Sequence, residues 1–75
     1  MSQVTIIHPV TGQSAQVTAA LLPAAAKLAA ARIADAHSKI AHYAKCNAAD
    51  KLDAERARLD VLLASQASIN AALES

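Results

Sequence analysis

The N-terminal stretch VTIIHPVTGQSAQVT, residues 4–18, sets the architecture expected for the whole chain. β-branched residues are frequent at both ends of the stretch, and Pro9 and Gly12 lie between them, where the chain has to turn. Gly12 is the only glycine of the sequence, so it marks the one position where a positive φ is easily adopted. The stretch therefore predicts a β-hairpin over about 4–18, closed by a type I turn with a bulge. A flexible N-terminal arm is the alternative interpretation.

The register of this hairpin follows from the distribution of its apolar residues. One register gathers nearly all of them on one face, and it pairs His8 with Gln13, Ile6 with Ala15 and Val4 with Val17. The other face then carries Thr5, Ser14, Gln16 and one apolar exception, Ile7. Because a slip of one residue would mix the two faces, the sequence predicts this register.

Two helices are expected after the hairpin. Alanine dominates residues 19–46, where Pro23 suits a first helical turn and nothing further along breaks a helix. Asn47 tolerates the left-handed conformation that ends helices, and Asp50 can cap a second helix over about 50–73. Helices of similar length joined by a short turn predict an antiparallel helical hairpin. One unbroken helix of about 50 residues is the alternative, since no glycine or proline forbids it.

Apolar residues recur at seven-residue spacing in both helices, as in a packed seam between them. The seam expected on the first helix consists of Leu22, Ala26, Ala29, Ile33, Ala36, Ile40 and Tyr43. The seam expected on the second consists of Leu52, Glu55, Leu59, Leu62, Gln66, Ile69 and Leu73. The predicted fold is therefore α+β and mostly α, with residues 1–75 forming a single domain.

Charge is distributed unevenly along the chain. Lys27 is the first charged residue, and six of the seven basic and five of the six acidic residues lie between 32 and 60. In the expected fold these residues gather near the turn between the helices, while the end that carries the β-hairpin is nearly neutral. A second small-residue stripe on the second helix, which includes Val61 and Ala64, adds a surface for a neighbour.

A chain of 75 residues with a single aromatic residue has little bulky apolar material for a core of its own. Cys46 is the only cysteine, so no disulfide can form within the chain. Oligomerisation is the remaining common means of stabilising so small a domain. We therefore expect a homodimer or higher oligomer that associates through Val4, Ile6, Val17, Val61 and Ala64.

The sequence predicts neither an enzyme nor a bound cofactor. It contains no glycine-rich phosphate loop and no nucleophile elbow. His42 and Cys46 share one helix face, but a metal site needs three or four ligands, so no metal is expected. A secretory signal pattern and a long apolar run are both missing, which predicts a cytoplasmic protein that does not enter a membrane.

The function expected is that of a small protein–protein interaction module of the adaptor, assembly-factor or inhibitor type. Tyrosine is enriched at binding hot spots, and the candidate contact residues near the charged turn are Lys39, His42, Tyr43 and Arg56. The alternative is a small nucleic-acid-binding protein that uses the β-ribbon or a basic flank made of Arg32, Lys39, Lys45, Arg56 and Arg58. Acidic residues lie among these basic ones, which favours the protein-interaction interpretation.

Overall fold

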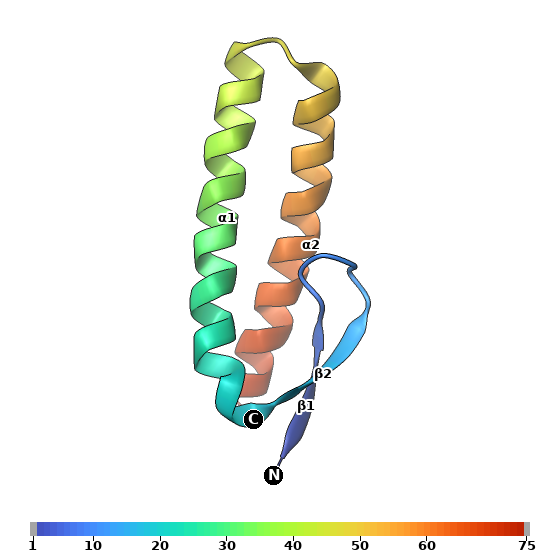
Figure 1. The fold of residues 1–75 in the computed structure, drawn as a ribbon, viewed down its shortest axis with the longest axis vertical. Helices are drawn as coiled ribbons and strands as arrows, with labels where there is room; N and C mark the ends of the chain where they lie inside the picture. The colour runs from blue at the N-terminus through green and yellow to red at the C-terminus, as the bar shows by residue number, and fades with distance from the viewer. Residues whose placement is uncertain (1, 75) are drawn as a thin grey trace.

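The computed structural model describes residues 2–74, which form a two-stranded sheet followed by two long helices (Figure 1). The elements in chain order are β1 (Gln3–Ile7), β2 (Ser14–Thr18), a 3₁₀ turn η1 (Ala19–Leu21), α1 (Leu22–Lys45) and α2 (Ala49–Glu74). The two helices pack side by side as an antiparallel hairpin. The expected α+β, mostly helical fold is confirmed, and the alternatives of a flexible arm and of one continuous helix are wrong.

The β-hairpin has the register predicted from the sequence. Val4 lies opposite Val17 and Ile6 lies opposite Ala15, with the two strands antiparallel. The turn is closed by two hydrogen bonds: the amide of His8 donates to the carbonyl of Gln13 at 2.8 Å, and the amide of Gly12 donates to the carbonyl of His8 at 3.0 Å. Gly12 has a φ of 74°, the left-handed conformation for which the sequence offers its one glycine.

The ends of the helices follow the prediction in part. Asn47 has a φ of 54°, so it ends α1 in the left-handed conformation as expected. The prediction that Asp50 caps the second helix is wrong, because α2 begins one residue earlier and Asp50 lies in its first turn. There its negative charge still faces the positive end of the helix dipole. Residues 19–21 form a separate 3₁₀ turn, and α1 begins after it at Leu22. Thr18, the residue before this turn, makes no side-chain capping bond.

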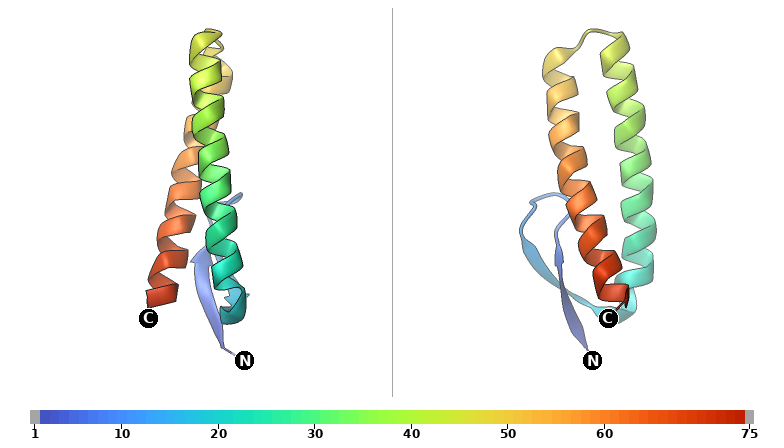
Figure 2. Two further views of the ribbon diagram at one scale, coloured as in Figure 1. Left: turned by 90° about the vertical axis from the view of Figure 1, so that its left-hand side faces the viewer. Right: turned by 180° about the vertical axis from the view of Figure 1, so that it is seen from behind.

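The β-hairpin packs against the C-terminal half of α2, at the open end of the helical hairpin (Figure 1). The left panel of Figure 2 shows the helices diverging toward this end, where the strands lie. Ile6 is 5% exposed and forms one apolar cluster with Leu22, Ala29 and Ile69. A two-stranded ribbon alone is marginal in water, so this contact with the helices is what makes the ribbon stable.

The two flanks of the helical hairpin differ in what covers them. We use the name hairpin flank for the side on which Val61 and Ser68 of α2 contact the β-hairpin. There the amide of Ile7 donates to Ser68 Oγ at 2.8 Å, and Val61 lies beside Gly12. The opposite side is the open flank. Leu63 lies on the open flank, because it follows Val61 by two residues and each residue turns the direction of the side chain by about 100° around the helix axis. The right panel of Figure 2 views the open flank, and no strand passes in front of the helices there.

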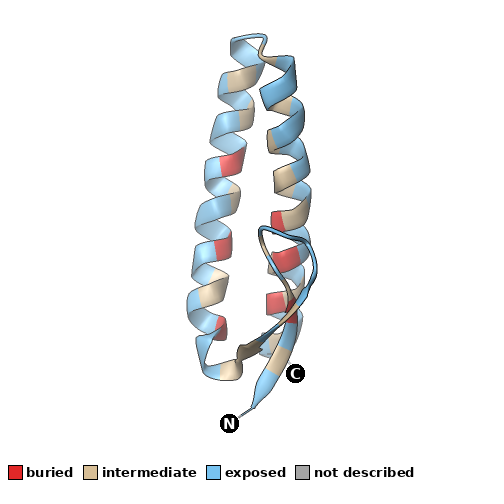
Figure 3. Cartoon of the chain, turned by 45° about the vertical axis from the view of Figure 1, so that its right-hand side comes forward, coloured by how far each residue is buried: buried red, intermediate tan, exposed pale blue. Residues whose placement is uncertain are grey.

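Figure 3 shows that the buried segments of the helices lie on the sides that face each other and the strands. Leu22, Ala29 and Ile69 are buried beside Ile6 of the hairpin. The other buried helix residues among those described are Ala36, Leu62 and Ser65. Other seam residues are half-buried; these are Ala26, which packs against the Ile6 cluster, and Ile33, Ile40, Leu52, Leu59 and Gln66. Leu73, predicted in the seam, is 45% exposed, so it is not buried between the helices.

Candidate interaction surfaces

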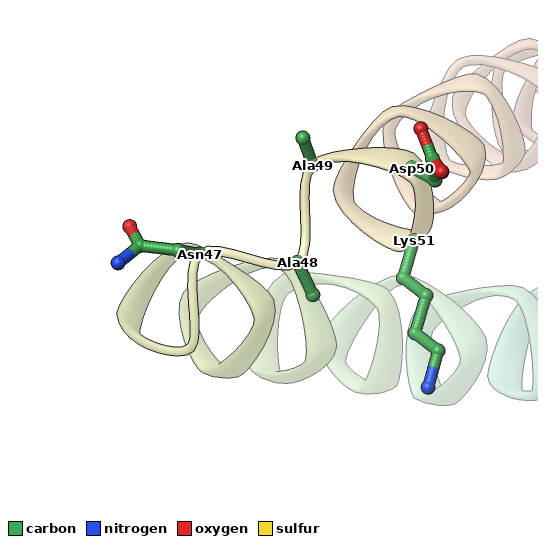
Figure 4. Close-up of a pocket in the computed structure, with 5 residues that line it drawn as sticks. All are labelled: Asn47, Ala48, Ala49, Asp50 and Lys51. Carbon is green, nitrogen blue, oxygen red and sulfur yellow. The ribbon is translucent and has the colours of Figure 1, made fainter.

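The turn between the helices presents an exposed cluster of aromatic and polar side chains. The ring of the half-buried Tyr43 lies 5.7 Å from the ring of His42, measured between centroids, and Lys51 Nζ lies 6.0 Å from the Tyr43 centroid. His42 Nε2 is 3.8 Å from Cys46 Sγ. A shallow hollow lined by residues 47–51 opens beside them at the turn (Figure 4). Tyrosine is one of the residue types enriched in protein-binding patches.

An ion-pair network joins the two helices below this turn. Asp35 Oδ2 accepts from Lys39 Nζ at 3.2 Å and from Arg58 Nη1 at 3.3 Å, and Arg58 also pairs with Glu55. The hydrogen bonds from Lys39 and then Arg58 lower the pKa of Asp35 from its ordinary value of 3.8. The bond to Glu55, followed by that to Asp35, raises the pKa of Arg58. The positive charges of Lys39 and Arg58 are therefore largely compensated within the chain.

The structure brings together three of the four residues predicted to contact a partner protein. Lys39, His42 and Tyr43 lie near the turn, spaced along one side of α1. Arg56 is two residues from Arg58, so helix geometry places it about 200° away, on the open flank. Lys51, which the sequence analysis missed, lies beside Tyr43 instead. Its contact depends on how α1 and α2 are aligned, which no pattern within either helix reveals.

The basic residues of the nucleic-acid alternative do not form one stripe. Lys39 and Arg58 share the hairpin flank with the acids that pair with them. Arg56 lies on the opposite flank, and Lys45, at the end of α1, is turned away from Lys39. The separation of Arg56 from Arg58 could have been recognised from the sequence, because neighbours two apart never share a helix face.

Most residues predicted to mediate self-association have neighbours within the chain. Val4 and Val17 pack against the apolar cluster that contains Ile6, and Val61 lies beside Gly12. Ala64 is exposed. The outer edge of β1 faces α2 through the bond to Ser68, whereas β2 has no further strand beside it in the described part of the chain.

The open flank is a side of the helical hairpin that β1 and β2 leave uncovered. Leu63 and Leu73 are 44% and 45% exposed, and they continue a line of half-buried seam residues from both helices. Exposed apolar residues also occur elsewhere, because Leu21 of η1, Leu28 of α1 and Val10 of the hairpin turn are 57%, 54% and 78% exposed. The sequence does not show which flank the β-hairpin covers, so the open flank could not be predicted from it.

Two further findings concern residues 2–74. No three His, Cys, Asp or Glu side chains among them are arranged to hold a metal ion. Neither α1 nor α2, as far as they are described, contains an apolar segment long enough to cross a bilayer.

The comparisons with known proteins give no relative: no family model, curated protein or solved structure matches this sequence. The fold therefore defines the class of protein by itself, as an antiparallel helical hairpin with an N-terminal β-hairpin packed on one flank.

Proposed function

We propose that this protein is a non-enzymatic protein–protein interaction module that works as a homo-oligomer, in the manner of an adaptor, assembly factor or small inhibitor. The observation that carries the proposal is the uneven burial of the helical hairpin. The strands cover the C-terminal half of α2 on the hairpin flank, whereas half-buried apolar seam residues and the exposed Leu63 lie on the flank that β1 and β2 do not cover. A large apolar patch left exposed marks an association site in soluble proteins.

The small size of the chain also favours association with a second copy. Native domains are stabilised by roughly 0.05–0.15 kcal/mol per residue, or about 4–11 kcal/mol for a chain of this length. Here the buried hydrophobic core consists of Ile6, Leu22, Ala29, Ala36, Leu62 and Ile69, of which two are alanines. Covering the half-buried leucines and isoleucines with a second subunit would add apolar burial at about 25 cal/mol per Å².

The turn end supplies a second surface, suited to a different protein. Tyr43, His42 and Lys51 lie together there, far from the β-hairpin along the 48 Å length of the molecule. A tyrosine ring can contribute contact area with little loss of conformational entropy, which suits a recognition site.

Sedimentation equilibrium over the micromolar range tests the proposal. We expect a mass of twice 7.7 kDa or a higher multiple, and an unfolding temperature that rises with protein concentration, because association stabilises the folded state by mass action. A stable 7.7 kDa species at every concentration would contradict the homo-oligomer. Tight binding of duplex DNA at low salt that is lost at moderate salt would instead favour the nucleic-acid alternative.

A further inference from the structure

We infer that two copies of this chain pair through their open flanks about a two-fold axis parallel to the helices, so that α1 of one copy lies against α2 of the other. This inference rests on the proposed homo-oligomer and specifies its interface. The resulting dimer is a four-helix bundle with one β-hairpin on each outer side. The occupant of the open flank is thus a second copy of this chain.

The size of the open flank matches what a stable dimer needs. α1 and α2 contain 24 and 26 residues, which at 1.5 Å per residue gives lengths of about 36–39 Å. Two helices side by side are roughly 20 Å wide, so the flank has a projected area of about 700 Å². A standard protein–protein interface buries about 800 Å² per partner. The projected area of the flank is therefore close to that of one side of a standard interface.

The charges at the rims of the open flank favour one orientation of the two copies. Helix geometry places Lys27 and His37 at the open-flank rim of α1, which carries no acid. The corresponding rim of α2 carries three acids and one arginine, a net charge of −2; these residues are Asp53, Arg56, Asp60 and Glu74. An axis parallel to the helices sets the basic rim of one copy against the acidic rim of the other. A perpendicular axis would set each rim against itself and bring like charges together.

The orientation has a consequence for function. With the axis parallel to the helices, both turns lie at one end of the dimer and both β-hairpins at the other. The patch around Tyr43 then occurs twice at the same end of the dimer, once on each outer side. A partner with two matching sites would gain affinity from the pairing without any new contact.

A matched pair of variants tests which flank is the interface. Leu63→Glu places a carboxylate on the open flank, and Leu28→Glu places one at a leucine of similar exposure on the hairpin flank: the two side chains are 44% and 54% exposed. Leu28 lies on the hairpin flank because it is seven residues before Asp35, which pairs with Arg58. Burying a charge without a partner is costly, so Leu63→Glu should raise the dimer dissociation constant at least about tenfold, while Leu28→Glu leaves it nearly unchanged.

Circular dichroism of both variants shows whether the helices are retained. A wild-type chain that sediments as a monomer overturns the proposed function and this inference together. A wild-type dimer that Leu28→Glu dissociates and Leu63→Glu does not overturns the inference alone. An equal effect of the two variants also overturns it, because the open flank would then have no special role.

The axis is tested with spin labels on Cys46, the single cysteine, which is exposed near the turn. In the proposed dimer the two labels lie across two helix layers, so electron–electron distance measurements should give about 20–30 Å. A perpendicular axis, or edge-to-edge pairing of the two β2 strands, puts the turns at opposite ends of the dimer. The labels would then be more than about 40 Å apart, and such a distance would overturn the parallel axis.

Discussion

Replacing Ile6 by alanine measures how far the β-hairpin contributes to the core. The Ile6 side chain is 5% exposed and packs between the helices on Leu22, Ala29 and Ile69. Alanine removes three carbon groups, each with a transfer free energy of about 0.8 kcal/mol, and leaves a cavity that adds to the cost. We therefore expect the free energy of unfolding to fall by about 3 kcal/mol. That is a large part of the roughly 4–11 kcal/mol available to a chain of this length.

Urea denaturation followed by far-ultraviolet circular dichroism, at one fixed protein concentration, measures this loss. The control is Thr5→Ala, which changes the neighbouring strand residue on the exposed face and should alter stability by less than about 0.5 kcal/mol. The reasoning would be refuted by equal midpoints for the two variants. In that case the strands would contribute nothing to the packing of the helices.

Three further changes test individual contacts. Ser68→Ala removes the acceptor of the Ile7 amide, so we expect a loss of about 1–2 kcal/mol and faster hydrogen exchange at Ile7; unchanged exchange would contradict the contact. Ser65→Ala removes a fully buried hydroxyl whose oxygen has no hydrogen-bond partner among the described residues, so thermal unfolding should show stability equal to or above that of the wild type. Asp35→Asn should lower the unfolding temperature slightly at pH 7, because a carboxylate with a lowered pKa stabilises the fold above pH 3.8. The difference in unfolding temperature between Asp35→Asn and the wild type should disappear as the pH falls below 3.8 and through the lowered pKa of Asp35. A difference that persisted at that low pH would exclude the ion pairs of Asp35 as its cause.

The hairpin and its register could be predicted because local patterns determine them. Val4, Ile6 and Val17 alternate with polar residues, and one glycine fixes where the chain reverses. The turn between the helices was predictable for a similar reason, since Asn47 is a residue that adopts a positive φ readily.

The arrangement of the elements relative to one another was not predictable in the same way. Heptad spacing identifies the seam between the helices but does not say which flank the strands cover. The burial of Ser65 follows from that choice, and a polar residue gives no apolar signal in the sequence. The contact of Lys51 with Tyr43 likewise depends on the alignment of two helices across their turn.

Methyl nuclear magnetic resonance of the wild-type chain during dilution tests most directly whether the strands cover one flank and a second copy covers the other. As the dimer dissociates, the resonances of Ile33, Ile40 and Leu63 should shift, because their flank passes from a neighbour to water. The resonances of Leu21 and Leu28 should stay in place. Shifts confined to these last two leucines would contradict the account, since they would place the contact between copies on the side that carries the β-hairpin.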